Sequence, residues 1–469
     1  MPRKSKKILK DITITGLHPS GRTFGYWGDR KVYIDNALVG ETVDVEISSH
    51  QRNWLSGNLL QIKTQSAHRV KPFCKHADIC GGCIWQHIAY NHQLQLKKQI
   101  VENFLSKQKL DFPPIADVVA SPQTTYFRNK LDFSFSSRRW YYEDEGKVIK
   151  QEDRVAMGFH PAHMPEKVFN INECYLLQEP ALAIAMFVKE YALQHGIPFH
   201  DPKENTGLLH SVSVRISSLF EIIVNIVFTE AREDTIKPMM QSIRTEFPQI
   251  TLLCYEILNL THPDFSLPTT YCSNTQTSIK ETSNGLVFEY GKNAFYQPNP
   301  KQAEIIYTRI KEIAALKGTE NIIDLYCGIG TISLILASKA KHVTGIEGNL
   351  QAVENAGNNA SVNNVENATF ICGDILQTFT PAFLNMQEGV DLIILDPPRA
   401  GTLINIKKTI LASGAKQVIY LSCNPESLAT DLKMLCEKYT IASIEPYDMF
   451  PHTAHVETLV LLKLKKEAE

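Results

Sequence analysis

Long apolar runs, cysteine and surplus charge are all scarce in this sequence of 469 residues. No segment approaches the roughly 18 consecutive apolar residues of a membrane-spanning helix, so we expect no membrane insertion. The basic start of the chain, residues 1–10, is not followed by an apolar stretch. This argues against an export signal and makes a cytoplasmic location the default expectation. Ten cysteines are too few for a scaffold held together by disulfide bonds.

The charge balance is close to neutral, with 48 Lys and Arg against 50 Asp and Glu, a net charge of −2. Such a balance does not indicate a nucleic-acid binder, but a local basic face is enough for binding. We interpret the basic residues at the start of the chain as a solvated tail. They are Arg3, Lys4, Lys6, Lys7 and Lys10. The proportions of hydrophobic residues (43%) and charged residues (21%) are typical of a globular protein, here long enough for about three domains.

The first two regions of the chain differ in their patterns. Residues 8–64 hold five short strand-like segments punctuated by Gly, Pro, Asn or Asp, which predicts an OB-like β-barrel over 1–68. Such barrels often bind oligonucleotides, although shape alone does not establish function. Residues 69–290 combine a helical pattern over 92–108, a second helix near 179–195 and several strands. This mixture predicts a central α+β domain.

Residues 291–469 change character, because continuous apolar runs alternate there with helical patterns. Fully buried parallel strands have this appearance. The alternation predicts a doubly wound α/β, Rossmann-like domain. The predicted parallel strands are NIIDLY, HVTGIE, ATFICGD, DLIILDPP and QVIYLSC.

A glycine-containing turn follows the first of these strands, in the segment DLYCGIG at 324–330. A glycine such as Gly328 lets the backbone approach a ligand closely. Glu347 ends the next strand, where a carboxylate can accept hydrogen bonds from ribose hydroxyl groups. The third glycine of the dinucleotide motif is missing. Its absence disfavours NAD and favours S-adenosylmethionine, a cofactor that has no pyrophosphate.

Two further strand ends carry acidic residues, Asp374 and Asp396. Ligands of open α/β sheets bind at the carboxyl ends of the strands, so both residues are candidate cofactor contacts. Asp374 is equally well interpreted as the N-cap of the helix that follows it.

A candidate nucleophile closes the last apolar strand, in the motif SCNP at 422–425. Cys423 is well placed there for covalent chemistry, although a lone cysteine is more often a small core residue. Two companion motifs favour the catalytic interpretation, DPPR at 396–399 and HVET at 455–458. Glu457 is a candidate general base, the alternative being a solvent-facing strand residue. We expect SCNP to begin a helix whose N-terminus helps to ionise the thiol.

Together with FYQPN at 295–299, these motifs closely resemble those of the RNA uracil-C5 methyltransferases, and the resemblance covers nearly the whole chain. It implies that Cys423 is the nucleophile and Glu457 the general base. It also implies an S-adenosylmethionine site, to which we add Gly328 and Asp374 as further candidate contacts. The residues that the resemblance assigns to this site are Gln297, Tyr326, Glu347 and Asp396.

The N-terminal barrel resembles the TRAM domain, an RNA-binding module found in part of the same family. The bacterial transfer-RNA enzymes of the family typically lack both this barrel and a cysteine cluster. We therefore expect 23S ribosomal RNA as the substrate, with transfer RNA as the alternative. No obligate protein partner is evident, and we expect a monomer.

Three cysteines, Cys74, Cys80 and Cys83, lie within ten residues of each other. In a chain without an export signal, such a cluster indicates a metal site before it indicates disulfides. The spacing C-x5-C-G-G-C matches the iron–sulfur motif of the family, and the resemblance implies Cys174 as the fourth ligand. Four thiolates suit a 4Fe–4S cluster, and zinc is the competing interpretation. The radical motif C-x3-C-x2-C is absent, which favours a structural or RNA-contacting role.

Uracil C5 is a poor nucleophile, so the implied reaction needs a cysteine that adds to C6, a methyl donor and a base that removes the C5 proton. The target base must also leave its stack, which costs least in loops and bulges. Two segments, 126–130 and 138–142, interleave basic with aromatic residues. They are candidates for RNA contact, with ordinary strand packing as the alternative.

Two other functions compete with this interpretation. A non-catalytic RNA-binding assembly factor would have no use for Cys423 and Glu457. An exocyclic-amine methyltransferase typically carries an aromatic residue after Asn/Asp-Pro-Pro, whereas Arg399 stands at that position here.

Overall fold

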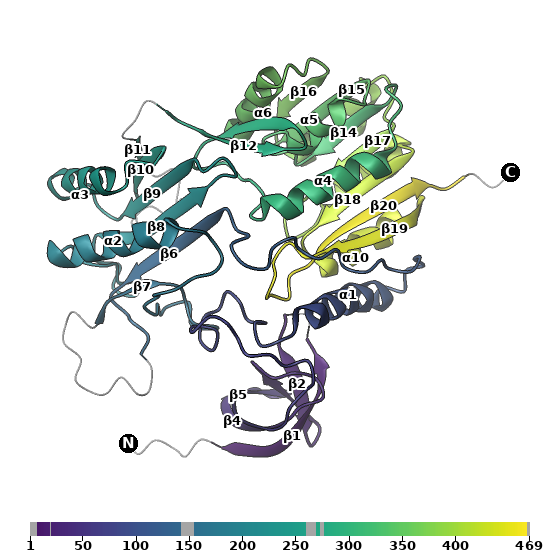
Figure 1. The fold of residues 1–469 in the computed structure, drawn as a ribbon. Coiled ribbons are helices and arrows are strands. Elements are labelled where there is room, and N and C mark those ends of the chain that lie inside the picture. The colour runs from purple at the N-terminus through teal and green to yellow at the C-terminus, as the bar shows by residue number, and fades with distance from the viewer. Residues whose placement is uncertain (1–6, 19, 142–153, 259–268, 273–275, 467–469) are drawn as a thin grey trace.

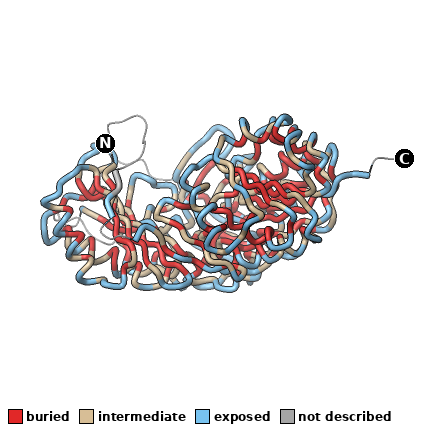
Figure 2. Tube along the Cα trace, turned by 90° about the horizontal axis from the view of Figure 1, so that it is seen from above, coloured by how far each residue is buried: buried red, intermediate tan, exposed pale blue. Residues whose placement is uncertain are grey.

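The structure is a computed structural model that describes residues 7–18, 20–141, 154–258, 269–272 and 276–466. Three bodies make up the molecule, and Figure 1 shows the N-terminal barrel below a central sheet and a C-terminal sheet that lie side by side. Buried residues run through the interior and exposed residues cover the outside (Figure 2). None of the helices within the described ranges combines the length and apolarity needed to cross a lipid bilayer.

The first five strands close into a small barrel in the order β1-β2-β3-β5-β4, which confirms the predicted barrel. Side chains alternate along β3, so that Val32 and Ile34 are fully buried while their neighbours Lys31 and Tyr33 are half-buried. The buried side chains form an apolar core that belongs to the barrel alone. The strands are β1 (Ile8–Leu17), β2 (Thr23–Trp27), β3 (Arg30–Ile34), β4 (Thr42–His50) and β5 (Trp54–Thr64).

One long helix, α1 (Tyr90–Lys107), follows the barrel where the apolar spacing predicts it. This helix packs against the C-terminal body, because it contacts α10 (Pro425–Leu435) and β19 (Tyr439–Tyr447). Its residues Val101 and Leu105 are fully buried in the core of that body. Part of the segment that the sequence pattern assigns to the central domain therefore lies on the third one (Figure 1).

The central body is a six-stranded sheet in the order β11-β10-β9-β8-β6-β7, accompanied by two helices. A two-stranded hairpin then leads into the third body. The elements of the sheet are β6 (Lys130–Ser136), β7 (Ala156–Gly158), β8 (Leu209–Ile216), β9 (Ile222–Phe228), β10 (Leu252–Ile257), β11 (Thr269–Cys272), α2 (Ala181–Gln194) and α3 (Glu233–Glu246). The hairpin is β12 (Ile279–Ser283) and β13 (Leu286–Tyr290). Cys254 and Cys272 are paired across β10 and β11 and form a disulfide that the sequence analysis did not anticipate.

The C-terminal body is a seven-stranded sheet in the order β16-β15-β14-β17-β18-β20-β19. The strands from β16 to β18 run parallel, whereas β20 is antiparallel to β18. From β14 the chain winds outward through β15 and β16, and then returns to build the other side from β17 onward. This confirms the predicted doubly wound fold.

The elements of this body include the strands β14 (Asn321–Leu325), β15 (His342–Glu347), β16 (Ala368–Cys372), β17 (Leu392–Leu395), β18 (Gln417–Ser422) and β20 (Glu457–Leu464). Its helices, besides α10, are α4 (Pro300–Ala314), α5 (Thr331–Ala337), α6 (Leu350–Val362), α7 (Ile375–Thr378), α8 (Pro381–Asn385) and α9 (Ile404–Ser413).

Candidate active site

The candidate site lies at the carboxyl ends of β14 and β17, where the winding direction of the sheet reverses. The register pairs Leu325 with Leu395, so the turn at 326–330 and Asp396 leave the sheet side by side. Open α/β sheets bind their ligands at such a switch point.

Two glycines shape the turn after β14. Gly328 (φ 56°) and Gly330 (φ 83°) both have left-handed backbone conformations, which favour glycine. A Cβ atom on Gly330 would lie 2.9 Å from the Phe370 ring, so packing also requires glycine there. A Cβ atom on Gly328 would meet nothing within 4 Å. The backbone at Gly328 therefore borders open space in which a ligand can lie.

The carboxylate of Glu347 holds this turn from the neighbouring strand. Its Oε2 accepts a hydrogen bond from the backbone N–H of Gly328 at 3.2 Å, and its Oε1 accepts one from the N–H of Asn349 at 2.9 Å. The side chain is half-buried. Each carboxylate oxygen can accept a further hydrogen bond, so Glu347 fits the predicted contact with ribose hydroxyl groups.

Three other predicted cofactor residues surround the same edge. Tyr326 is half-buried and also left-handed (φ 65°). Gln297 is buried, and its backbone carbonyl accepts a hydrogen bond from Asn129 Nδ2 at 3.0 Å. Asp374 caps α7, because its Oδ1 accepts two backbone N–H groups of the first helical turn. The N-cap interpretation therefore holds for Asp374, and its contact with the cofactor stays a prediction.

Two carboxyl groups at this edge have unusually high pKa values. Burial raises the pKa of Asp324 to about 7, although Asp324 accepts a hydrogen bond from Ser333 Oγ at 2.5 Å. Burial, and then the charge of Asp324, raises the pKa of Asp396 to about 7. A cationic ligand beside such groups stabilises their ionised forms. The sulfonium of S-adenosylmethionine is a cation, so the donor set fits this cofactor.

Cys423 and Glu457 are neighbours across two strands. The antiparallel pair β18 and β20 ends with Ser422 opposite Thr458. Cys423 directly follows Ser422 and Glu457 directly precedes Thr458, so both lie at this end of the strand pair. The charge of Glu457 also acts on the Cys423 thiol. The thiol and the carboxyl group therefore share one site.

The motifs SCNP and DPPR are joined at the start of α10. Asn424 is the N-cap, and its side chain accepts the backbone N–H of Glu426, as expected for a helix that begins with Pro425. The Nδ2 atom of Asn424 donates a hydrogen bond to the backbone carbonyl of Arg399 at 2.8 Å. The predicted helix start is confirmed, and it fixes one motif against the other.

The charges around Cys423 and Glu457 oppose the expected ionisation of the thiol. Burial, followed by the carboxyl groups of Glu457 and Asp396, raises the pKa of Cys423 to about 11. Burial, followed by Asp396, raises the pKa of Glu457 to about 8, and Glu457 is only 3% exposed. Arg399 lowers both values. Arg399 was not among the predicted site residues, although the DPPR motif pointed to it.

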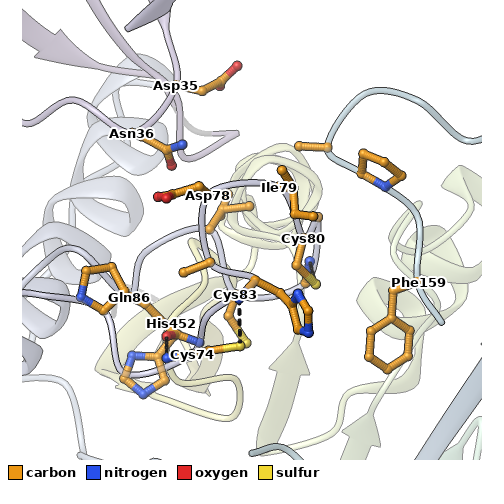
Figure 3. Close-up of a pocket in the computed structure, with 18 of the residues that line it drawn as sticks. Asp35, Asn36, Cys74, Asp78, Ile79, Cys80, Cys83, Gln86, Phe159 and His452 are labelled. Carbon is orange, nitrogen blue, oxygen red and sulfur yellow. Dashed lines mark hydrogen bonds between the residues drawn. The ribbon is translucent and has the colours of Figure 1, made fainter. Parts of the chain in front are cut away.

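The four predicted cluster cysteines line a second site, a cavity of about 1500 Å³ between the barrel and the central sheet. Figure 3 shows the first three turned toward the pocket, with Asp35 and Asn36 of the barrel on its far side. The four are Cys74, Cys80, Cys83 and Cys174.

The sulfur atoms in this cavity have polar neighbours. The backbone N–H of His76 lies 3.4 Å from Cys74 Sγ, and that of Gly82 lies 3.4 Å from Cys80 Sγ. Burial raises the pKa of Cys83 to about 12. Within the described ranges, however, no three His, Cys, Asp or Glu side chains are placed as ligands of a metal ion. The chemistry of the four thiols suits a cluster, but the structure does not demonstrate one.

The predicted RNA-contacting segments have mixed environments. Arg128, Lys130 and Trp140 line the cysteine cavity. Phe127 is buried, as the packing alternative expected, and Arg138 is paired with Asp201. Tyr142 of the second segment lies outside the described residues, as do Arg3, Lys4 and Lys6 of the predicted solvated tail.

Comparison with known proteins identifies the family of this chain. Residues 220–465 match the profile of the family described as tRNA (uracil-5-)-methyltransferase, and residues 9–60 match the TRAM domain. A Bacteroides thetaiotaomicron protein named as an uncharacterized RNA methyltransferase is 35% identical over 450 residues, 95% of this chain and 99% of that one. The chain belongs to the tRNA (uracil-5-)-methyltransferase family. It is an S-adenosylmethionine-dependent RNA uracil-5-methyltransferase with an N-terminal TRAM domain.

Two further similarities extend over the whole length. A Porphyromonas gingivalis protein, also named as an uncharacterized RNA methyltransferase, is 35% identical over 460 residues, 96% of this chain and 99% of its own. The crystal structure of Pyrococcus abyssi tRNA (uracil-54, C5)-methyltransferase with S-adenosyl-L-homocysteine superposes with a TM-score of 0.73 at 24% identity. It covers 97% of this chain and 100% of its own, so the two proteins share their fold.

Proposed function

We propose that this RNA uracil-5-methyltransferase acts through a covalent bond between Cys423 and uracil C6, with Glu457 as the general base. The observation that carries the proposal is that Cys423 and Glu457 flank the terminal Ser422–Thr458 pair of β18 and β20, with the charge of Glu457 acting on the Cys423 thiol. A nucleophile and a base at one end of a strand pair can act on adjacent carbons of one ring.

The protein groups move two protons in this reaction. Cys423 loses its thiol proton to solvent, its sulfur bonds to C6, and the electrons of the C5–C6 double bond become available at C5. When bound, S-adenosylmethionine would supply the methyl group that C5 takes up, leaving S-adenosylhomocysteine. Glu457 then accepts the C5 proton, and the electrons of that C–H bond restore the C5–C6 double bond as the Cys423 thiolate leaves. With a pKa of about 8, Glu457 can both hold and release a proton near neutral pH.

An RNA that contains 5-fluorouridine tests this assignment. Fluorine replaces the hydrogen at C5, so Glu457 finds no proton to remove after methyl transfer. The methylated RNA therefore stays bonded to Cys423. The expected result is a protein–RNA adduct that survives a denaturing gel and needs S-adenosylmethionine. Cys423→Ala should give none, whereas full methyl transfer by that variant would overturn the proposal.

The cofactor is proposed to lie against the turn at 326–330. Glu347 is suited to hold its ribose, since its carboxylate already faces the open space at Gly328. Asp396, with its raised pKa, is suited to the cationic end of the cofactor. Gln297, Tyr326 and Asp374 complete the proposed contacts.

The target base is proposed to enter a small cavity of about 230 Å³ that is lined by Arg399, whose charge acts on both Cys423 and Glu457. Arg399 and His455 line it from the C-terminal body, Gly81 and Gly82 from the loop between Cys80 and Cys83, and Ser20 from the barrel. Because three bodies contribute to its wall, the pocket suits a nucleotide that has been turned out of its strand.

The outer face of the barrel carries exposed aromatic side chains next to lysines, and we propose this aromatic and basic stripe as an RNA-binding surface. Tyr26, Trp27 and Trp54 are 48%, 41% and 36% exposed. The ammonium of Lys7 lies 3.7 Å from the Trp27 ring centre, and Lys31 lies over the Phe24 ring. Stacking platforms with cationic neighbours are typical of single-stranded nucleic-acid binding.

The RNA substrate is proposed to be 23S ribosomal RNA, with transfer RNA as the second candidate. The transfer-RNA candidate is favoured by the Pyrococcus abyssi tRNA (uracil-54, C5)-methyltransferase, whose fold matches this chain over 97% of its length. The barrel is part of the matched length, so its presence alone does not distinguish the two substrates. Mapping 5-methyluridines in both RNAs from a deletion strain decides. Loss at a single ribosomal site supports the first candidate, and loss only in transfer RNA supports the second.

A 4Fe–4S cluster on Cys74, Cys80, Cys83 and Cys174 is also proposed. Its support is that four thiols face one cavity and that backbone N–H groups point at two of the sulfurs. Iron, sulfide and zinc contents of protein purified without air test it. Four iron atoms per chain support the cluster, whereas one zinc atom supports the alternative.

The domain boundaries at 68 and 290 are likewise proposals, with α1 attached to the third body. A monomeric state and a cytoplasmic location stay predictions.

A further inference from the structure

Three polar side chains on α1 form hydrogen bonds with the segment that directly precedes Glu457, the proposed base. Tyr90, Gln93 and Lys97 lie three and four residues apart, so they share one face of the helix. That face is turned to residues 448–456, the connection between β19 and β20. Figure 1 shows α1 below these two strands. The two segments are far apart in the sequence, since 351 positions separate Lys97 from Asp448.

The centre of this contact is a fully buried ion pair. Lys97 Nζ lies 2.5 Å from Asp448 Oδ1, and both side chains are 0% exposed. Lys97 also donates to the backbone carbonyl of Phe450 at 3.0 Å. The other oxygen of Asp448 accepts the Tyr90 hydroxyl at 2.7 Å. The carboxylate is therefore bonded on both sides by α1.

A second set of bonds holds the same segment at His452. The backbone N–H of His452 donates to Gln93 Oε1 at 2.9 Å, and its carbonyl accepts the backbone N–H of Trp85 at 2.9 Å. His452 has a left-handed backbone (φ 63°), which is uncommon for a residue other than glycine. Such a conformation persists where the surroundings impose it, and here α1 and the preceding loop do so.

Residues 448–456 lead directly to Glu457, the first residue of β20. Asp448 follows Tyr447, which is the register partner of Glu457. Thr453, Ala454 and His455 line the proposed base pocket. Burying a charged pair is weak evidence for stabilisation, since apolar residues of similar volume often serve a fold equally well. A charged pair does fix one geometry, because any shift of the segment leaves a buried charge without its partner.

We propose that Lys97 is a positioning residue for the methyl transfer: through Asp448 and Phe450 it fixes the segment that presents Glu457 to the reacting ring. The inference rests on the proposed role of Glu457. Removing the C5 proton is then the step most sensitive to the Lys97–Asp448 pair. Misplacing a catalytic group by about 1 Å can slow its step by about 10²-fold.

The test measures whether a single turnover stops at the covalent protein–RNA adduct or continues to free methylated RNA. Full-length protein is mixed with labelled S-adenosylmethionine and total RNA from a strain that lacks the gene. Methyl label in the covalent protein–RNA adduct is then separated from label in free RNA. Lys97→Met leaves Asp448 buried without a partner, so the double variant Lys97→Met/Asp448→Asn, which removes both charges and keeps similar shapes, is made as well. Lys98→Met is the matched control, because the half-buried Lys98 pairs with the exposed Asp117, outside residues 448–456.

We expect the double variant to accumulate labelled adduct and to release methylated RNA about 10²-fold more slowly, and we expect Glu457→Gln to accumulate adduct as well. The Lys98→Met control should release RNA at the normal rate. An equal loss of adduct and free product in the double variant indicates a purely structural role and overturns the inference. If Glu457→Gln itself traps no adduct, the assignment of the base fails, and the inference falls with it.

Discussion

The catalytic edge and the cysteine cavity are built in different ways. Cys423 directly follows the last residue of β18 and Glu457 is the first residue of the adjacent strand β20, so the pairing of these strands brings the two residues to one end of the sheet. The cysteine cavity joins a loop before α1, a segment of the central body and the wall of the barrel, so its shape depends on how separate bodies pack. The edge is therefore a local product of one sheet, whereas the cavity is a product of the whole molecule. Substitutions at the two sites should differ in the step that they affect.

The largest effect is expected from Cys423→Ala at the catalytic edge. Removing an enzyme nucleophile costs up to about 10⁶-fold in rate, and we expect a loss of at least about 10⁴-fold in methyl transfer from labelled S-adenosylmethionine. Folding should be unchanged, because Cys423 is only half-buried. The control is Cys436→Ala, a half-buried thiol at the far end of α10. A Cys423→Ala variant within tenfold of the unaltered protein would contradict the covalent mechanism.

A smaller effect is expected from Glu347→Ala, which separates cofactor binding from chemistry at the same edge. Loss of hydrogen bonds to a charged group costs about 1.5–3 kcal/mol, which corresponds to a roughly 10- to 100-fold higher KM for S-adenosylmethionine. The Cys423 reaction at saturating cofactor should change little. Exposed Glu354 on α6 provides the control variant Glu354→Ala. Equal KM values for both variants would remove Glu347 from the cofactor site.

The barrel should affect RNA binding alone. Loss of one stacking platform costs about 1–3 kcal/mol, so Trp54→Ala should raise the KM for RNA without changing the KM for S-adenosylmethionine. Phe220→Ala is the matched control, since Phe220 is 65% exposed on the central body. If Phe220→Ala weakens RNA binding as much as Trp54→Ala, the stripe on the barrel is not the binding face.

The smallest expected effect is a shift in pH dependence from Arg399→Gln. Glu457 must lose its proton before it can act as a base, so activity should rise as the pH passes the pKa of about 8. Arg399 lowers the pKa of Glu457, and its removal should move the rise to higher pH. Single-turnover rates measured across this range check the shift. A rate that falls equally at every pH would show that Arg399 acts in some other way.

The predictions from sequence succeeded best where one residue pattern had a single physical meaning. The buried run LIIL of β17 can only be a core strand, and all four of its residues are buried. Helix α3 was missed although Ile236, Met239, Met240 and Ile243 follow helical spacing, because Pro238 argues against a helix interior. β19 was missed as well, since its alternation of exposed and buried residues gives a weaker signal than a continuous apolar run.

The packing of α1 illustrates what sequence pattern could not decide. Its apolar spacing predicted the helix, but the same spacing fits any apolar surface, and the structure places it on β19 and α10 rather than on the central sheet. The pairing of Lys97 with Asp448 had no signal in either segment, because each is an ordinary charged residue in its local context.

The sequence alone predicted the type of each domain and the motifs at the strand ends, and the family resemblance implied the roles of Cys423 and Glu457. The domain types follow from periodicity and residue chemistry, which act over a few neighbouring residues. Only the tertiary structure decided that burial raises the pKa values of Cys423 and Glu457, that four cysteines share one cavity and that α1 holds the segment before Glu457. Burial and long-range contact depend on which surfaces meet, and no local pattern records that.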